Sequence, residues 1–184
     1  MNRTEAFLLL QQKLQNPNLI KHSLAVEAGM IKLAQFFSQD KEDWGLAGLL
    51  HDIDYEQTKD DPDRHSLVGA EMLRAAGLSD SVVEAVKTHN QAHGLVPETL
   101  MAKALFCLDP LTGLIVAATL VLPNRKIKDL TVDSVLHRFR EKSFARGANR
   151  EIIAKCQEYL GLELNDFVSL VLSAMQDIDR DLGL

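Results

Sequence analysis

Apolar residues recur at helical spacing along most of this chain. In segment 18–37 they cover nearly every face of the expected helix, which is typical of a helix at the centre of a protein. No alternation of the kind that marks a β-strand persists over five residues. The pattern therefore predicts an all-α fold. Helices are expected at 4–15, 18–37, 42–52, 65–76, 79–91, 97–108, 111–122, 131–143, 149–160 and 164–181.

Several residues indicate where these helices begin, end or approach one another. Thr4 and Asn149 are candidate N-caps, and Gly77 is placed to end a helix. Proline disfavours helical geometry at the residue before it, so Asp109-Pro110 predicts a break between two helices. Polar segment 54–64 is expected to be a loop. Gly48, near the end of an apolar helix, indicates close packing against a neighbouring helix.

The composition is that of an ordinary globular protein, with 46% hydrophobic and 25% charged residues. At 184 residues the chain is expected to form a single domain, 1–184. Its net charge of −6 argues against long nucleic acid as a partner. The charge is uneven, however, because segment 124–155 holds nine Lys or Arg against four Asp or Glu, a net of +5.

The two cysteines, Cys107 and Cys156, lie in apolar contexts, which favours buried thiols in a reducing compartment. The apolar run near the N-terminus is too short for a signal peptide. The longest apolar region, 105–122, contains Asp109 and Pro110, so a membrane span is not expected. These features predict a cytoplasmic protein.

Histidine and aspartate residues recur on apolar helix faces or at the ends of helices. The doublet His51-Asp52 ends the apolar helix 42–52, where an unpaired charge would be costly. Four further residues come from other segments, as expected of a metal site in the core of a helical bundle. They are His22, His65, His89 and Asp109. Imidazole and carboxylate suit iron, manganese, zinc, cobalt or nickel.

This arrangement resembles the HD superfamily of metal-dependent phosphohydrolases, an all-α fold. The resemblance rests on Lys21-His22-Ser23-Leu24, Leu50-His51-Asp52-Ile53-Asp54, Arg64-His65-Ser66-Leu67 and Thr88-His89-Asn90, and it covers about residues 15–125. It implies an HD-domain bundle of about eight or nine helices, with a metal-binding core at 15–125 and the C-terminal helices of 126–184 packed on it. The extra His65 and His89 resemble the branch that binds two metals.

Carried over residue by residue, the resemblance implies one metal held by His22, His51, Asp52 and Asp109. Asp52 would bridge to a second metal held also by His65 and His89. The cofactor would be one or two divalent ions, iron or manganese first, with zinc, cobalt and nickel also suitable. Metal-activated hydroxide would then attack phosphorus, which makes Asp52 a candidate catalytic group.

Other candidates surround this set. Asp54 is a candidate general acid, and equally a residue that supports the ligands or caps the loop. Many two-metal members of the family have a substrate-binding lysine where this chain has Tyr55, which donates a hydrogen bond but carries no fixed charge. Arg146 and Lys142 are candidates for phosphate contacts, against a plain solvated helix face. Thr112 and Gly113 are candidates for lining the pocket.

The first functional hypothesis is a phosphohydrolase acting on a small phosphorylated molecule or nucleotide. A di-iron oxygenase using the same ligands is the second, and a non-catalytic metal-binding regulatory module is the third. His93, at the end of its helix, is expected to face solvent or to support the ligands, and His137 is expected at the surface. A homodimer is compatible with the sequence, and packing or subunit contact is the role expected of the helices of 150–184.

Overall fold

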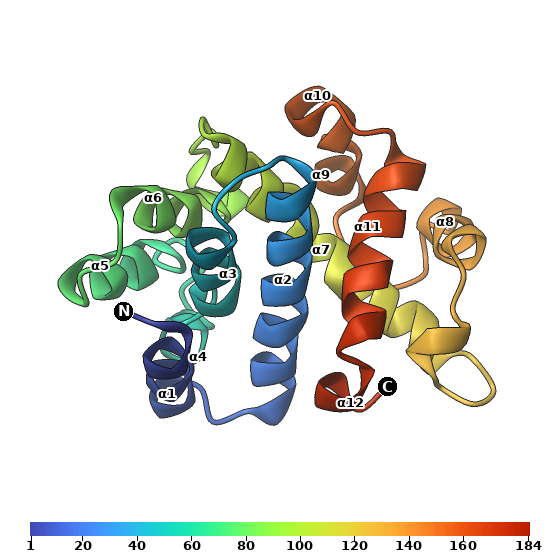
Figure 1. The fold of residues 1–184 in the computed structure, drawn as a ribbon, viewed down its shortest axis with the longest axis horizontal. Coiled ribbons are helices and arrows are strands. Elements are labelled where there is room, and N and C mark those ends of the chain that lie inside the picture. Colours follow the sequence, from blue (N-terminus) through green and yellow to red (C-terminus); the bar gives the residue numbers. More distant parts are fainter.

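The computed structural model describes all of residues 1–184 and contains helices, turns and loops but no strand (Figure 1). Eight α-helices have nine residues or more, and the short α9 and α10 continue one another across Lys155. The all-α prediction and the expected eight or nine helices are thus confirmed. The α-helices are α1 Arg3–Lys13, α2 Pro17–Phe36, α3 Lys41–Leu50, α4 Tyr55–Thr58, α5 Leu67–Ala75, α6 Asp80–Thr88, α7 Leu100–Leu120, α8 Val132–Arg140, α9 Arg150–Ala154, α10 Cys156–Leu160, α11 Leu164–Asp177 and α12 Asp179–Leu182.

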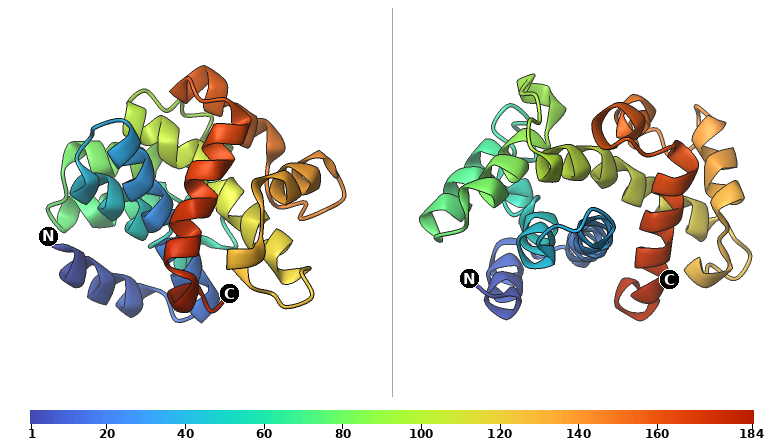
Figure 2. Two further views of the ribbon diagram at one scale, coloured as in Figure 1. Left: turned by 45° about the vertical axis from the view of Figure 1, so that its right-hand side comes forward. Right: turned by 45° about the horizontal axis from the view of Figure 1, so that its top comes forward.

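Helices α2 and α7 form the centre of the fold. Helix α3 packs along one side of α2 and α11 along the other, while α7 crosses behind α2 (Figures 1 and 2). Helix α6 packs on the first part of α7 and carries α5 on its outer side, whereas α8 packs on α7 and α11. A single apolar core connects these helices. The arrangement brings one end of α3 against the middle of α7. Four histidines lie close together at this point: His22, His51, His65 and His89.

Gly48 allows α2 and α3 to approach closely, as predicted. A Cβ atom at this position would lie 2.9 Å from the backbone N and Cα of Glu27, closer than a side chain tolerates. The adjacent residues of α3 are all buried. Because the backbones touch here, the end of α3 has a fixed distance from α2.

The predicted break at Asp109-Pro110 is wrong. Helix α7 runs without interruption through Pro110 from Leu100 to Leu120. Proline inside a helix costs about 3 kcal/mol, but thirteen residues of α7 are buried, and this burial outweighs the local preference. By length and composition alone α7 would suffice to cross a membrane; here 61% of its most apolar window is buried in the fold.

The helix ends follow the predictions in part. Asn149 caps α9 by accepting from the backbone N–H groups of Glu151 and Ile152, as predicted. The predicted cap at Thr4 is wrong, because Asn2 and Glu5 form a capping box that starts α1 two residues earlier. The loop at 54–64 contains one helical turn, α4, which begins at Tyr55.

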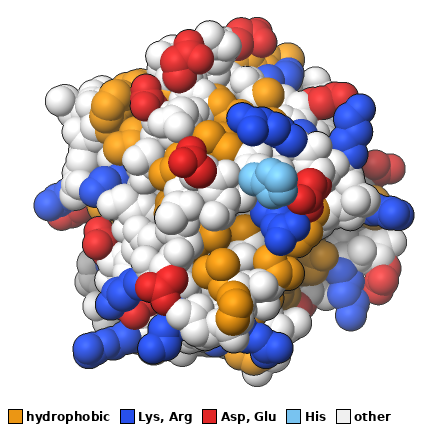
Figure 3. Space-filling view, turned by 90° about the vertical axis from the view of Figure 1, so that its right-hand side faces the viewer, with side chains coloured by type: hydrophobic (Ala, Val, Ile, Leu, Met, Phe, Trp, Pro, Cys, Tyr) orange, Lys and Arg blue, Asp and Glu red, His pale blue; other side chains and the backbone are white.

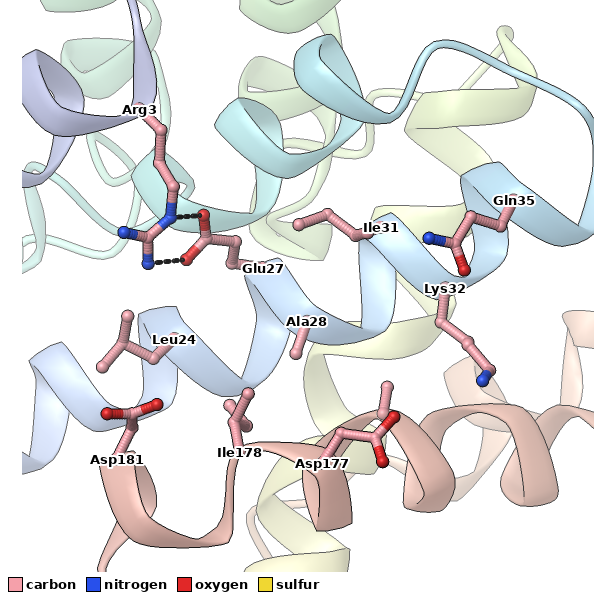
Figure 4. Close-up of a pocket in the computed structure, with 11 residues that line it drawn as sticks. Arg3, Leu24, Glu27, Ala28, Ile31, Lys32, Gln35, Asp177, Ile178 and Asp181 are labelled. Atoms are coloured by element: carbon pink, nitrogen blue, oxygen red, sulfur yellow. Dashed lines mark hydrogen bonds and ion pairs between the residues drawn. The ribbon is translucent and has the colours of Figure 1, made fainter.

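An ion pair fastens α1 to α2. Both oxygens of Glu27 accept hydrogen bonds from the Arg3 guanidinium, at 2.6 and 2.9 Å (Figure 4). The Glu27 side chain is 6% exposed, so Arg3 supplies the partner that a buried carboxylate needs. The pair lies in a groove of about 320 Å³ between α2 and α11–α12, on the face of α2 opposite His22. Lys32, Asp177 and Asp181 also line this groove, so both signs of charge are present.

Candidate metal centre

The six residues singled out as metal ligands meet at one place. They come from α2, the end of α3, the loop after α4, the end of α6 and the middle of α7. His51 is fully buried, and Asp52 and His89 are nearly so, whereas His22, His65 and Asp109 are partly exposed. The site is therefore closed on the side of α3 and open on the side of α2 and α7.

One half of the cluster contains His22, His51 and Asp109. The Nε2 atom of His22 lies 3.0 Å from Oδ1 of Asp109 and 3.2 Å from Nε2 of His51. Oδ2 of Asp52 faces the same space, 3.4 Å from Nε2 of His51. Four potential ligand atoms from three helices thus surround one point.

The other half contains His65 and His89. Their Nε2 atoms lie 3.2 and 3.4 Å from Oδ1 of Asp52. Ligand atoms of His51, Asp52 and His89 also lie within 4.8 Å of one another. The two oxygens of Asp52 therefore face different groups of histidines, which is the geometry that a carboxylate bridging two cations requires.

The ring nitrogens that face away from the centre have hydrogen-bond acceptors. Nδ1 of His51 donates to the carbonyl of Gly48 at 2.9 Å, and Nδ1 of His89 donates to that of Val86 at 2.6 Å. Nδ1 of His22 donates to Oγ1 of Thr112 at 3.2 Å, which in turn donates to the Asp109 carbonyl. With these protons on Nδ1, each Nε2 presents a lone pair to the centre, as a metal ligand does.

These residues fit a divalent cation. Neutral imidazoles and carboxylates are suitable ligands for first-row metals, and lone pairs that face one another at about 3 Å need a cation or a proton between them. The geometry and the donor set together indicate binding of a divalent metal, with Asp52 shared between two groups of ligands.

Charge coupling within the cluster is strong. Burial alone would raise the pKa of Asp52, but the adjacent His51, together with the nearby rings of His65 and His89, holds it well below its ordinary value. Burial would likewise raise the pKa of Asp109, yet His22 and His51 hold it far below normal. Both carboxylates are thus ionised and ready to bind a cation.

Asp54 lies behind the cluster and organises it. Its side chain is buried; Oδ1 accepts from Nδ1 of His65 at 3.0 Å, and Oδ2 accepts from the backbone N–H groups of Ser66 and Gly69 at 2.8 and 2.9 Å. A Cβ at position 69 would lie 3.2 Å from this carboxylate. Of the three roles open for Asp54, this geometry favours support of His65 over general acid catalysis, and its side chain makes no capping hydrogen bond to α4.

The loop that carries His65 has a second support, formed by Ser66, Asn90 and His93. Ser66 is buried with a positive φ of 71°, a conformation uncommon for residues other than glycine. His93 Nε2 contacts both the His65 carbonyl and the Ser66 hydroxyl, and Asn90 donates to the carbonyls of Pro62 and His65. His93 therefore supports the ligand loop, one of the two roles expected for it.

The candidate substrate contacts differ in their distance from the cluster: Tyr55 lies against a ligand, whereas neither Lys142 nor Arg146 lines the cavity beside His22 and Asp109. Tyr55 is 38% exposed, and its ring stands edge-on to that of His65 with centroids 5.5 Å apart. Arg146 is exposed between Ala145 and Gly147, which line a cavity bordered by His22 and Asp109. Lys142 is exposed on the same loop. Gly113 lines this cavity, as expected. Thr112 does not line it and instead hydrogen-bonds Nδ1 of His22.

The positions outside the cluster agree with the remaining expectations. His137 is 70% exposed on α8 and pairs with Glu141. Cys107 and Cys156 are buried as free thiols, and burial raises their pKa values to about 12 and about 11.

Fold and site together define an all-α protein with a candidate divalent-metal centre built from histidine and aspartate. The HD domain family matches residues 19–112, so the chain belongs to this family. It is 28% identical to ribonuclease Y of Lawsonia intracellularis over 138 residues. The aligned region covers 73% of this chain and 26% of that protein. Ribonuclease Y of Thermoanaerobacter pseudethanolicus is 29% identical, over 73% of this chain and 27% of its own length. The chain thus spans about a quarter of these relatives. No solved structure matches it.

Proposed function

We propose that this protein is a metal-dependent phosphohydrolase that acts on a small phosphorylated molecule or nucleotide. The observation that carries the proposal is the position of Asp52, whose two oxygens face His51 on one side and His65 and His89 on the other. When bound there, divalent metal supplies a Lewis acid that polarises a phosphoryl oxygen and acidifies water.

The residues of the chain would hold and orient the reacting groups. His22, His51 and Asp109 would form one metal site, and His65 and His89 the other, with Asp52 in both. Asp54 would keep His65 in its ligand orientation. Tyr55 can donate a hydrogen bond to the substrate from the rim, and Arg146 can offer a bidentate contact to phosphate.

The surface favours a small substrate. Part of the charge of the basic segment 124–155 is engaged locally. Arg138 pairs with Glu141, Lys128 pairs with Asp179, and Arg150 donates to the carbonyls of Phe144, Ala145 and Ala148. On the face that carries α8, basic side chains are interspersed with acidic ones (Figure 3). A long RNA would require a continuous positive surface.

A second candidate is cleavage of RNA, because the similar proteins named above are ribonucleases. The two candidates share the metal site and differ in the substrate. The negative net charge of −6 weighs against the second candidate.

We also propose that the protein is cytoplasmic, which the two buried free thiols support.

One experiment on protein purified without chelator separates these possibilities. Elemental analysis should find two equivalents of metal per chain. Phosphate release from nucleotides and sugar phosphates with manganese or cobalt would support the proposal, and cleavage of a single-stranded oligoribonucleotide alone would support the second candidate. Oxygen uptake with a mixed-valence iron signal would instead identify an oxygenase, and absence of all three activities would favour a regulatory module.

A further inference from the structure

Two adjoining cavities open from the exposed side of the metal centre. The first, of about 340 Å³, lies between α7 and the loop of residues 145–148, and the second, of about 470 Å³, extends from α2 to residues 182–184. His22 and Gly113 line both, so the two form one cleft that begins at the metal ligands. Sites for small molecules commonly occupy about 300–1,000 Å³.

Lys21 gives this cleft a cation. It is half-buried, and it is the one Lys or Arg that lines either cavity. No carboxylate pairs with its ammonium, in contrast to Arg3, Lys128 and Arg138 elsewhere in the protein. Its Nζ lies beside the backbone of Gly183, where an added Cβ would be 2.9 Å away. A partly buried ammonium without a partner is suited to bind an anion.

The far wall of the cleft is apolar. Val116 and Leu120 follow Gly113 on one face of α7 at helical spacing, and Leu182 of α12 lies on the same cavity. Leu120 is 48% exposed, which is unusual in a helix whose other apolar residues are mostly buried. This wall offers a surface on which a flat ring can pack.

We propose that the cleft binds a nucleotide whose phosphates extend from the metal centre to Lys21 and whose base packs on Val116, Leu120 and Leu182. The inference rests on the proposed hydrolase function for the phosphate at the metals. It adds Lys21 as a positioning residue and the apolar wall as the part that selects a nucleoside over a sugar phosphate. A metal site, one ammonium and an apolar wall are the contacts that such a ligand needs.

Equilibrium binding to the manganese-loaded protein tests the nucleotide proposal. Two probes are used in which a methylene group links the two phosphorus atoms and cannot be hydrolysed. One is α,β-methylene-ADP, and the other is methylenediphosphonate, which has the same anionic part without a nucleoside. The nucleotide should bind more tightly than the diphosphonate. Lys21→Gln and Lys21→Ala should each weaken both probes about tenfold or more. Leu120→Gln should weaken the nucleotide about fivefold and leave the diphosphonate unchanged.

Lys32→Ala is the matched control, since Lys32 lies about three turns further along the same helix, lines the separate groove beside Asp177, and should leave both affinities unchanged. Wild-type affinity for the diphosphonate in both Lys21 variants, with folding intact by circular dichroism, would overturn the role of Lys21. Equal affinity of the two probes for the wild type would overturn the nucleotide assignment. Binding as expected with no phosphate release from any substrate would refute the hydrolase proposal and leave this site standing.

Discussion

The Nε2 atoms of His22 and His51 lie 3.2 Å apart at the centre of the fold. The Nδ1 atom of each ring faces an oxygen that accepts a hydrogen bond, Thr112 Oγ1 for His22 and the Gly48 carbonyl for His51. Two lone pairs therefore face each other unless a proton or a metal ion lies between them. The behaviour of the protein toward metal and pH follows from this relationship.

Asp52→Ala should abolish metal binding at both proposed sites, because Asp52 contacts both groups of histidines. We expect elemental analysis to fall from two equivalents per chain to well below one. Asp60→Ala, in the exposed loop nearby, is the matched control and should retain both equivalents. Full stoichiometry in the Asp52 variant would refute the bridging role.

Asp54→Asn should weaken the second metal selectively. The Asp54 carboxylate accepts hydrogen bonds from three donors, one of them Nδ1 of His65. The amide of asparagine has one oxygen and one NH₂ group, so it cannot accept from all three. We expect His65 to lose its fixed orientation as a result. Loss of such a support costs roughly 10- to 100-fold in metal affinity. Calorimetric titration should show one weakened and one normal site, and Asp63→Asn should show two normal sites. Unchanged metal binding with lost phosphate release would instead favour a general-acid role for Asp54.

Metal affinity should rise with pH up to about 9. Burial alone would lower the pKa of His65, but hydrogen bonds to Asp52 and Asp54 outweigh it and raise the pKa to about 9 in the metal-free protein. His65 is therefore protonated near neutral pH, and metal must displace that proton. Titration in buffers of different ionisation enthalpy should detect the released proton. An affinity that is flat between about pH 7 and about 9 would contradict this.

The same pKa shift predicts the stability of the metal-free protein. The folded value lies above the ordinary value of about 6.5, so the stabilisation is complete below about pH 6.5. It should be lost as the pH rises through about 9. Urea unfolding in the presence of chelator should show this decline, and His65→Gln should reduce it.

Arg3→Ala should destabilise the protein without changing metal content. The substitution leaves the buried Glu27 carboxylate unpaired, although the 60% exposure of Arg3 moderates the effect. We expect a loss of about 1–3 kcal/mol in the free energy of unfolding. Adding Glu27→Gln should recover part of it. Lys13→Ala, exposed on the same helix, should change stability by less than about 0.5 kcal/mol.

The ligand set could be predicted because its members are polar residues at positions where apolar residues are expected. Histidine and aspartate on apolar helix faces require compensation, and His22, His51 and Asp109 stand out for this reason. Helix spacing also gave the correct element type over most of the chain. Local rules failed at Pro110, where the burial of a long apolar helix outweighs the preference of one residue.

The support of the site could not be predicted in the same way. Asp54 accepts from backbone groups of Ser66 and Gly69, and these are brought to it by a turn with positive φ at a serine. Backbone donors have no signature in residue type. The absence of an ion pair at Lys21 likewise depends on how α2, α7 and α12 are placed.

Gly48 connects helix packing to ion size. Its missing side chain lets α3 touch α2 at Glu27, and its carbonyl holds the ring of His51. A methyl group there would push the His51-Asp52 doublet away from His22 and widen the space between them. Selectivity among divalent ions depends on such dimensions. We therefore expect the contact between α2 and α3 at Gly48 to set the size of the metal ion that the centre accepts.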